Sequence, residues 1–322
     1  MLIDIHGRKI NYLRVSVTDR CNLRCRYCMP QDGVPLRRHQ DILSFEEIET
    51  IVRAAVELGV RKVRLTGGEP LLRHDFPKLA IKLASIPHLE ELALTTNGLL
   101  FAPLAGRLKQ AGIRRVNISL DTLRPERFRQ MTGSDDWARV IQAVEAAVGH
   151  GYEKVKLNVV AIAGYNDDEI QDFVNFARER EIDLRFIELM PLGNEYWSPE
   201  RSLSGLMLKS RVERVAQLQP LPPNGVAEQY RLIGSRTTIG FITPMTKPFC
   251  RTCNRLRLTA DGFLRPCLSS RVEVNIREPV RHGMSGAALR RLFYEALRLK
   301  PLGHKMNNGD HQSNRLMAEI GG

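Results

Sequence analysis

Along the first 190 residues, short apolar runs alternate with longer stretches in which apolar positions recur with helical spacing. The apolar runs are rich in β-branched residues and predict strands at 12–17, 62–66, 91–95, 115–120, 154–160 and 183–189. The amphipathic stretches predict helices at 44–58, 77–86, 103–111, 136–149 and 167–180. Such alternation is typical of βα units around a parallel sheet. Because six units are too few for a closed eight-stranded barrel, we predict an α/β fold, an incomplete (βα)6 TIM-like barrel with an open side.

The pattern changes after residue 190. A connector rich in Gly, Pro and Ser, at 192–204, precedes a predicted helix at 204–218 and a predicted hairpin built from 230–233 and 238–242. A second hairpin is predicted where 254–259 alternates and Ala260-Asp261-Gly262 forms a turn. A basic amphipathic helix is expected at 287–300. We therefore expect a barrel domain at 1–191 and a C-terminal domain at 192–322.

Composition adds two points to this picture. The 322 residues include 48 Lys and Arg against 36 Asp and Glu, and the net charge of +12 favours an anionic partner such as a nucleotide, RNA or a membrane surface. No apolar run reaches about 18 residues, so no membrane span is predicted. All six cysteines fall into two groups and leave none for a disulfide, which predicts metal ligation in a reducing cytoplasm.

The two groups each offer three thiols. Cys21, Cys25 and Cys28 follow the first predicted strand, and the other three are Cys250, Cys253 and Cys267. Structural zinc normally takes four protein ligands, whereas three thiolates on a four-iron, four-sulfur cluster leave one iron open for a substrate or cofactor. A zinc site completed by a distant histidine is the alternative, with His39 available to the first group and His282 to the second.

The first group also carries a family resemblance. Cys-x-x-x-Cys-x-Tyr-Cys resembles the signature of the radical S-adenosylmethionine (SAM) superfamily, in which the open iron chelates SAM and an electron splits it to a 5′-deoxyadenosyl radical. Thr66-Gly67-Gly68-Glu69-Pro70, at the end of the second predicted strand, resembles the Gly-Gly-Glu-Pro motif of the same superfamily. An ordinary tight turn is the alternative for this motif. The resemblance implies a partial barrel with its chemistry at the carboxyl ends of the strands.

Basic residues lie on three of the predicted strands. Arg14, Arg64 and Lys156 stand among apolar residues, where an unpaired buried charge would be costly. Each could face solvent or a neighbouring acid, but three on separate strands of one barrel are better explained by a polyphosphate, since charge-assisted contacts contribute about 1.5 to 3 kcal/mol each.

The whole chain resembles the molybdenum-cofactor biosynthesis protein A family, the GTP 3′,8-cyclases. The order of motifs, the thirteen residues between Cys253 and Cys267, and Arg255-x-Arg257 after the second cysteine pair carry this resemblance. It implies two [4Fe-4S] clusters, with the second facing the guanine base of GTP across the barrel from SAM. The implied contacts to SAM are Tyr27, Gly68, Glu69, Ser119 and Met190, and the implied contacts to GTP are Arg14, Arg64, Thr95, Lys156, Arg255 and Arg257. A tail ending in Gly321-Gly322 reaches the cavity in this family, so we assign Arg14, Gly321 and Gly322 catalytic roles, with a frayed end as the alternative for the tail.

The reaction implied is the conversion of GTP to (8S)-3′,8-cyclo-7,8-dihydroguanosine 5′-triphosphate, an early step of molybdopterin biosynthesis. Hydrogen abstraction from the ribose C3′ is followed by attack on C8 of guanine and one-electron reduction. The implied partners are an electron donor of the flavodoxin or ferredoxin type and a downstream cyclic pyranopterin monophosphate synthase. A homodimer stays open, and neither nucleic acid nor a membrane is expected as a partner.

Two other functions compete with this one. A radical SAM peptide maturase also carries auxiliary cysteines near its C-terminus, but usually more than three, and would not bind GTP tightly. A zinc-dependent RNA-binding protein would use the charge of +12, although the chain has no concentrated basic run and only 6% aromatic residues.

Overall fold

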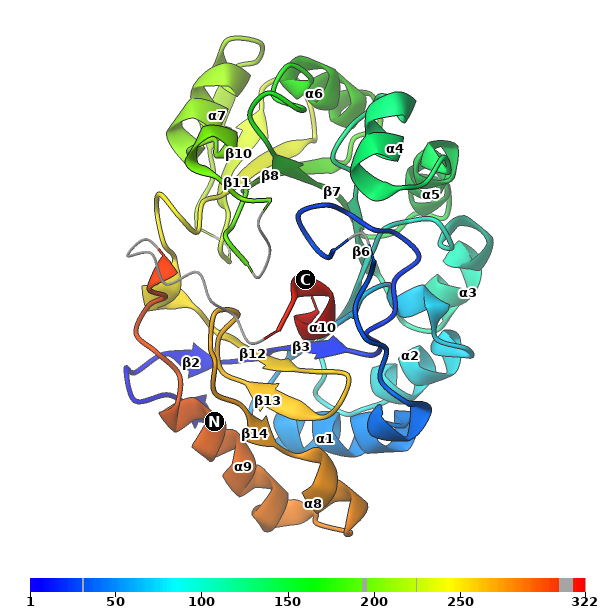
Figure 1. The fold of residues 1–322 in the computed structure, drawn as a ribbon, viewed down its shortest axis with the longest axis vertical. Helices are drawn as coiled ribbons and strands as arrows, with labels where there is room; N and C mark the ends of the chain where they lie inside the picture. Colours follow the sequence, from blue (N-terminus) through cyan, green and yellow to red (C-terminus); the bar gives the residue numbers. More distant parts are fainter. Residues whose placement is uncertain (31, 193–195, 224, 307–314, 322) are drawn as a thin grey trace.

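Six parallel strands form the centre of the molecule (Figure 1). The computed structural model describes residues 1–322 except 31, 193–195, 224, 307–314 and 322. The six strands are β3 (Tyr12–Ser16), β4 (Lys62–Thr66), β5 (Glu91–Thr96), β6 (Arg115–Ser119), β7 (Lys154–Ala161) and β8 (Asp183–Glu188). Each is hydrogen-bonded in parallel to the next. The predicted partial barrel is therefore confirmed.

The C-terminal part of the chain extends both edges of this sheet. β11 (Thr238–Ile242) pairs in parallel with β8, and β12 (Arg255–Leu258) pairs in parallel with β3. Antiparallel strands β10 (Glu228–Leu232) and β9 (Leu218–Pro220) continue one edge, and β13 (Phe263–Arg265) and β14 (Val274–Asn275) continue the other. Both predicted hairpins form, as β10 with β11 and β12 with β13. A separate two-stranded sheet, β1 (Leu2–Ile3) with β2 (Lys9–Ile10), lies at the N-terminus.

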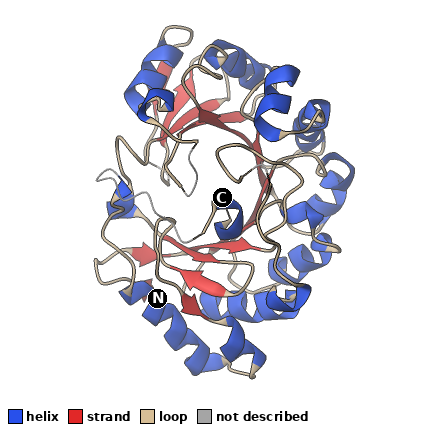
Figure 2. Cartoon of the chain, viewed as in Figure 1, coloured by secondary structure: helices blue, strands red, loops and turns tan. Residues whose placement is uncertain are grey.

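Helices cover the outer face of the curved sheet (Figure 2). Those between the barrel strands are α1 (Phe45–Glu57), α2 (Phe76–Ala84), α3 (Ala105–Gln110), α4 (Pro125–Thr132), α5 (Trp137–Gly149) and α6 (Ile170–Glu179). The C-terminal part adds α7 (Gly205–Glu213), α8 (Arg277–Arg281), α9 (Gly286–Arg298) and α10 (Met317–Ile320). The sequence pattern missed α4, α8 and α10, which are short. No helix in the described residues is both long and apolar enough to cross a membrane.

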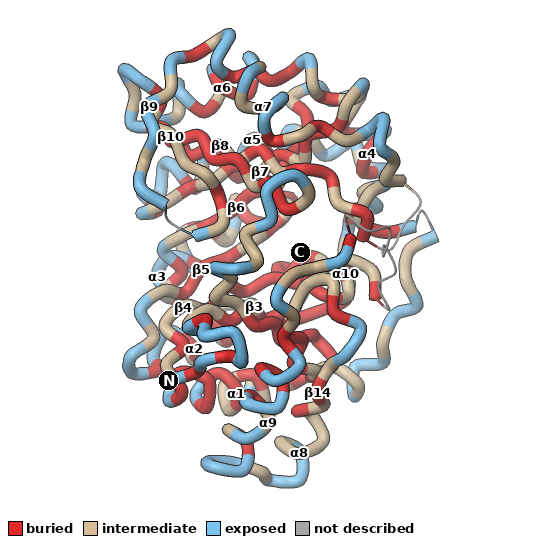
Figure 3. Tube along the Cα trace, turned by 90° about the vertical axis from the view of Figure 1, so that its left-hand side faces the viewer, coloured by how far each residue is buried: buried red, intermediate tan, exposed pale blue. Residues whose placement is uncertain are grey.

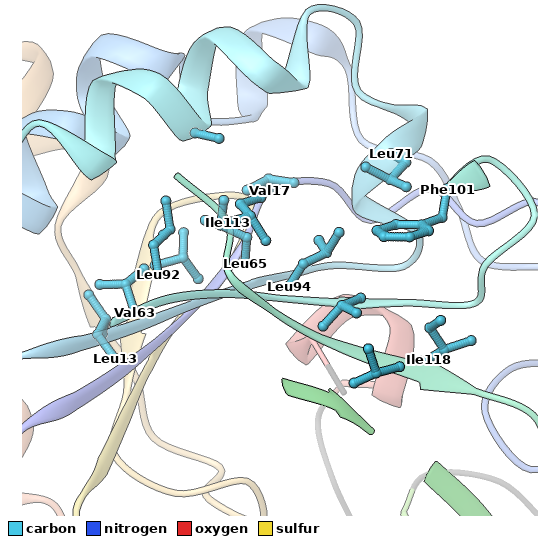
Figure 4. Packing of buried hydrophobic residues seen from close by; sticks show 14 of the residues in the cluster. Leu13, Val17, Val63, Leu65, Leu71, Leu92, Leu94, Phe101, Ile113 and Ile118 are labelled. Carbon is cyan, nitrogen blue, oxygen red and sulfur yellow. The ribbon is translucent and has the colours of Figure 1, made fainter. Parts of the chain in front are cut away.

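The hydrophobic core fills the layer between the strands and the helices. Leu13, Val63, Leu65 and Leu94, all fully buried, project from β3, β4 and β5 into this layer (Figure 4). Alternate residues of the same strands therefore point to the other side, into the barrel. Figure 3 shows the buried strands surrounding the barrel interior.

An aromatic cluster fastens β11 to the barrel. The ring of Phe186 on β8 lies 6.3 Å from the ring of Phe241, its partner on β11, and 6.3 Å from Phe173 of α6. All three side chains are at most 1% exposed. The C-terminal strand is thus packed into the same core as the helices of the barrel.

We expect Phe186→Ala to destabilise the protein by about 3–5 kcal/mol, because it leaves a cavity among these rings. Urea unfolding followed by circular dichroism measures the change. Leu206→Ala on α7 is the control, since Leu206 is 81% exposed, and its midpoint should stay near that of the unsubstituted chain. Equal midpoints for the two variants would contradict the packing role of Phe186.

Candidate active site

One cavity of about 350 Å³ occupies the barrel interior, and all six cysteines line it. Residues from both halves of the chain form its wall, including residues of strands β3 to β8 and β12 and of the loops after β11 and β13. The cysteine spacing alone did not place the two groups relative to each other, and only the family resemblance implied that they lie across the barrel from each other. The fold brings them to one cavity.

The first group lies on the loop that leaves β3. Cys21, Cys25 and Cys28 are all free thiols and partly buried. The loop is fastened to the end of α4, where the backbone N–H of Arg24 donates to the carbonyl of Thr132 at 2.8 Å. Helix α4, which the sequence pattern did not predict, thus supports the cysteine loop.

The glycine pair after β4 lets two chain segments cross closely. A Cβ atom on Gly67 would lie 2.6 Å from the carbonyl oxygen of Thr18, and one on Gly68 would lie 2.2 Å from that of Arg20. The N–H of Gly68 donates to Thr18 at 2.9 Å. Only glycine fits at these positions. The motif therefore braces the segment directly before Cys21, and both glycines also line the cavity.

Glu69 is fully buried and lies outside the cavity wall as the described residues form it. Its carboxylate accepts hydrogen bonds from Thr96 Oγ1 at 2.8 Å and from the N–H groups of Asn97 and Leu71 at 2.7 and 3.1 Å. Burial raises its pKa to about 7, although these hydrogen bonds oppose the shift. In this structure Glu69 holds the end of β5 in place.

Tyr27, Ser119 and Met190 line the cavity near the first group, as the sequence predicted for SAM contacts. The hydroxyl of Tyr27 donates to Asp121 Oδ2 at 2.8 Å, and Asp121 also accepts from the N–H of Val160 at 2.8 Å. Burial raises the pKa of Asp121 to about 6. Among the described residues that line the cavity, Asp121 is the single carboxylate.

The second group lies across the cavity at the start of β12. Cys250 begins a short 3-10 helix, Cys253 lies two residues before β12, and Cys267 lies two residues after β13. These thiols are also free and partly buried. Because β12 pairs with β3, the second group is fixed to the strand that leads to the first.

The thiols of the first group lie close together in one environment, and their chemistry tests whether a metal group fits there. Burial raises the pKa of Cys25, and the nearby Cys28, Asp121 and Cys21 add to the rise. Burial and Cys21 likewise raise the pKa of Cys28, to about 12. Three thiolates so close together are costly unless cationic iron binds them, so the donor set fits a cluster.

Zinc fits less well. In the described part of the chain, no three His, Cys, Asp or Glu side chains are placed to hold one metal ion. A cube of irons and sulfides spaces its thiolates farther apart than one ion does. His39 and His282, the candidate fourth ligands, are exposed, and His282 Nδ1 lies 2.8 Å from the carbonyl oxygen of Glu278.

A row of arginines lines the same cavity as the two cysteine groups. Arg257 on β12, Arg14 on β3 and Arg64 on β4 are neighbours in register, and all three line the cavity with Arg255. Burial and Arg257 together hold the pKa of Arg14 well below its usual range. The buried Nε of Arg255 has no hydrogen-bond partner among the described residues. The row offers more positive charge than the cavity wall balances, which fits an anionic ligand.

Tyr12 is the neighbour of these arginines. Its hydroxyl accepts from Arg64 Nε at 2.5 Å, and its ring centroid lies 5.5 Å from Arg255 Cζ. Burial would raise the pKa of Tyr12, but Arg64, Arg14 and Arg255 bring it down to about 7. The sequence analysis did not single out Tyr12, although it lies two residues before Arg14 on the same face of β3.

The two other residues predicted to contact GTP, Thr95 and Lys156, differ in whether they line the cavity. Thr95 lines the cavity, with its hydroxyl 3.5 Å from Arg64 Nη1. Lys156 does not line it and instead pairs with Asp183 at 3.5 Å, and burial lowers its pKa to about 8. Arg185 on β8 lines the cavity and was missed. The sequence did contain a sign of Arg185, because it is the one basic residue on a strand otherwise made of apolar and acidic residues. A basic residue on a predicted strand was also what identified Lys156.

The C-terminal tail enters the barrel. Helix α10 and the C-terminus lie in the middle of the ring of strands (Figure 1). The carbonyl of Gly321 accepts from Arg257 Nη1 at 2.6 Å, and a Cβ atom there would lie 2.8 Å from Thr66 Cγ2. With φ at +82°, Gly321 has a conformation that other residues rarely adopt. Gly322 lies outside the described residues.

Two family models match the chain. The Radical SAM superfamily matches residues 15–177, and Molybdenum Cofactor Synthesis C matches residues 182–306. The GTP 3′,8-cyclase of Moorella thermoacetica is 51% identical over 322 residues, covering 99% of each chain. The GTP 3′,8-cyclase of Syntrophomonas wolfei is 47% identical over 326 residues, covering all of both chains.

Solved structures of low sequence identity share the fold. SuiB of Streptococcus suis, bound to S-adenosylmethionine, has a TM-score of 0.67 at 15% identity and covers 95% of this chain and 75% of its own. Native anSMEcpe with bound AdoMet has a TM-score of 0.61 at 16% identity, with coverage of 94% and 84%. The fold is thus that of radical SAM enzymes, and the full-length identity to curated relatives shows that this chain belongs to the GTP 3′,8-cyclase family of the radical SAM superfamily.

Proposed function

We propose that this chain converts GTP to (8S)-3′,8-cyclo-7,8-dihydroguanosine 5′-triphosphate in molybdenum cofactor biosynthesis. The observation that carries the proposal is a single cavity lined by two three-cysteine groups and by a row of arginines. Membership of the radical SAM superfamily implies one [4Fe-4S] cluster and SAM. These groups, when bound, supply a 5′-deoxyadenosyl radical.

The first cysteine group and its surroundings form the SAM end of the cavity. Cys21, Cys25 and Cys28 hold the first cluster, and Tyr27, Gly68, Ser119 and Met190 contact SAM. Glu69 lies behind the cavity wall and acts indirectly, by fixing the end of β5 next to Asn97. Asp121 orients the hydroxyl of Tyr27.

The arginines and the second group form the GTP end. Cys250, Cys253 and Cys267 hold a second [4Fe-4S] cluster, whose open iron faces the guanine base. Arg14, Arg64, Arg255 and Arg257 bind the triphosphate with Thr95 and orient the ribose toward SAM. Arg185 joins them, and Lys156 acts at the edge of the cavity through its pair with Asp183.

The tail completes the site. Arg257 holds the carbonyl of Gly321 inside the barrel, so Gly321 is fixed beside the arginine row, and we assign the tail a role in turnover. A peptide maturase or a zinc-dependent RNA-binding protein has no use for this arrangement, because neither needs a cationic row in one cavity with two cysteine groups.

Further parts of the proposal concern the cell and the domains. We place the boundary between the radical SAM barrel, 1–191, and the C-terminal domain, 192–322, at the connector, although strands of both lie in one sheet. The six free thiols fit a reducing cytoplasm. A flavodoxin or ferredoxin would supply electrons, and a cyclic pyranopterin monophosphate synthase would take the product.

The two cysteine groups should differ in role. Anaerobic reconstitution should give about eight irons per chain, and replacing either group by alanine should leave about half, since each cluster holds four irons. Loss of the first group should abolish cleavage of SAM. Loss of the second should leave uncoupled 5′-deoxyadenosine while the cyclised product disappears, as chromatography would measure. Stoichiometric zinc without iron, or equal loss of SAM cleavage in both variants, would contradict the assignment.

The arginine row should bind GTP. Single changes of Arg14, Arg64, Arg255 or Arg257 to Ala should weaken GTP binding by about tenfold or more, which corresponds to about 1.4 kcal/mol, with little effect on SAM. Equilibrium dialysis without oxygen measures both affinities. Arg107→Ala on the exposed surface of α3 is the control. Unchanged GTP affinity in all four variants would show that the row serves another purpose.

The tail should affect turnover more than assembly. Gly321→Ala puts a methyl group against Thr66 and displaces the carbonyl from Arg257. Iron content, thermal stability and GTP affinity should stay near normal, while cyclisation collapses and uncoupled 5′-deoxyadenosine persists. Gly164→Ala is a matched control, because Gly164 also has a positive φ, +70°, but nothing within 4 Å of an added Cβ. Full cyclisation in Gly321→Ala would show that the tail is only an end.

A further inference from the structure

We propose that Lys300 is a positioning residue that raises the reduction potential of the second cluster above that of the first. This inference rests on the proposed function, since it requires a cluster on Cys250, Cys253 and Cys267. It adds a role for a residue outside the strands and outside the arginine row. Lys300 follows α9 and lines the cavity.

Lys300 is fixed in place by three acceptors. Its side chain is buried, with an exposed fraction of 2% for the residue. Nζ donates to the carbonyl oxygens of Arg255 and Pro266, both at 2.7 Å, and lies 3.7 Å from Cys253 Sγ. An ammonium group has three donors and no acceptor, so each of its protons has a partner. The two carbonyls belong to the segments that carry Cys253 and Cys267, and Lys300 ties these segments together.

A second buried cation, Arg8, lies close to the second cysteine group. Arg8 donates to the carbonyl of Cys250 at 2.7 Å and to that of Pro301, next to Lys300, at 2.7 Å. Its charge is balanced by Asp4, whose Oδ2 lies 2.6 Å from Arg8 Nε. Lys300 has no such ion pair with a described carboxylate, and its Nζ is held 3.7 Å from Cys253 Sγ.

The first cysteine group has the opposite surroundings. The charged neighbours that act on Cys25 and Cys28 include Asp121. Neutral donors reach Cys21, from the N–H of Leu23 at 3.5 Å and from Asn97 Nδ2 at 3.9 Å. Glu69 and Arg24 also act on Cys21, with opposite signs. The buried charge beside the first group is thus mainly that of carboxylates, whereas an ammonium lies beside the second.

The sign of the effect follows from charge. Reduction adds one negative charge to a cluster, and a fixed cation beside a ligand thiolate stabilises the reduced form more than the oxidised form. Hydrogen bonds to the sulfurs and local charge are established determinants of cluster potentials. Because Lys300 is removed from water, its charge is weakly screened. The second cluster should therefore be reduced at the higher potential.

The test is an anaerobic redox titration of the full-length protein with both clusters, without SAM or GTP, followed by electron paramagnetic resonance. Variants lacking one cysteine group at a time assign each signal to its cluster. In the unsubstituted chain the second cluster should be reduced at the higher potential. Lys300→Met should lower that potential and leave the first cluster unchanged, while Lys300→Arg, which keeps the charge, should restore most of the difference.

Lys305→Met is the matched control, because it removes the same charge from an exposed position of the same segment and should move neither potential. Iron is counted in every variant, and Lys300→Gln is titrated if Lys300→Met fails to keep eight irons. An unchanged second potential with full iron content, an equal shift of both clusters, or a lower potential for the second cluster of the unsubstituted chain would overturn the proposal. So would loss of the second cluster in both neutral variants, since Lys300 would then serve assembly. An unsubstituted chain without a second cluster would instead refute the proposed function.

Discussion

The parallel pairing of β12 with β3 is the constraint on which the cavity depends. It joins segments more than 240 residues apart and sets Arg257 beside Arg14 in register. Leu256 and Leu258 are fully buried in the core, so the alternate residues of β12 must face the barrel interior. A slip of one residue would put the arginines into the core and the leucines into the cavity, at prohibitive cost. Burial of two leucines thus also fixes where the arginines and the second cysteine group lie.

Gathering cations in a barrel is unfavourable until an anion binds. Burial lowers the pKa of Arg257 to about 10, and the neighbouring Arg255 adds to the effect, which measures how much the charged form is disfavoured. Several of the partners that the protein supplies there are neutral, such as the carbonyls of Gly321 and Leu94. Neutral acceptors satisfy the hydrogen bonds of the arginines without cancelling their charge. The site therefore keeps an electrostatic attraction that a polyphosphate can use, and the tail that supplies one acceptor can be displaced or adjusted by the ligand.

Local patterns in the sequence were sufficient for the barrel strands, most helices and the cysteine groups, because periodicity and motif spacing are local properties. The start of α1 is an example, where Ser44 and Glu47 form a capping box with both of its hydrogen bonds present. Long-range pairing was not predictable in this way. The glycines of the Gly-Gly-Glu-Pro motif were expected to make room for a ligand, whereas their tightest contacts are with the backbone of Thr18 and Arg20. Glu69 and Lys156 were recognised as important residue types, but whether a side chain reaches the cavity or its supporting layer depends on neighbours such as Thr96 and Asp183.

The cavity also has a polarity that ligand chemistry alone would not require. Asp121, the single carboxylate among its described lining residues, lies at the first cysteine group, and the arginine row lines the same cavity. SAM carries a sulfonium and an ammonium group, and GTP carries a polyphosphate. In a cavity with low-dielectric walls, such a field acts at a distance, before any hydrogen bond has formed. If the proposed function holds, this field would direct SAM toward the first cysteine group and GTP toward the arginines, and the hydrogen bonds would need to fix orientation only. Such a division would let one continuous cavity hold two nucleosides without exchanging their positions.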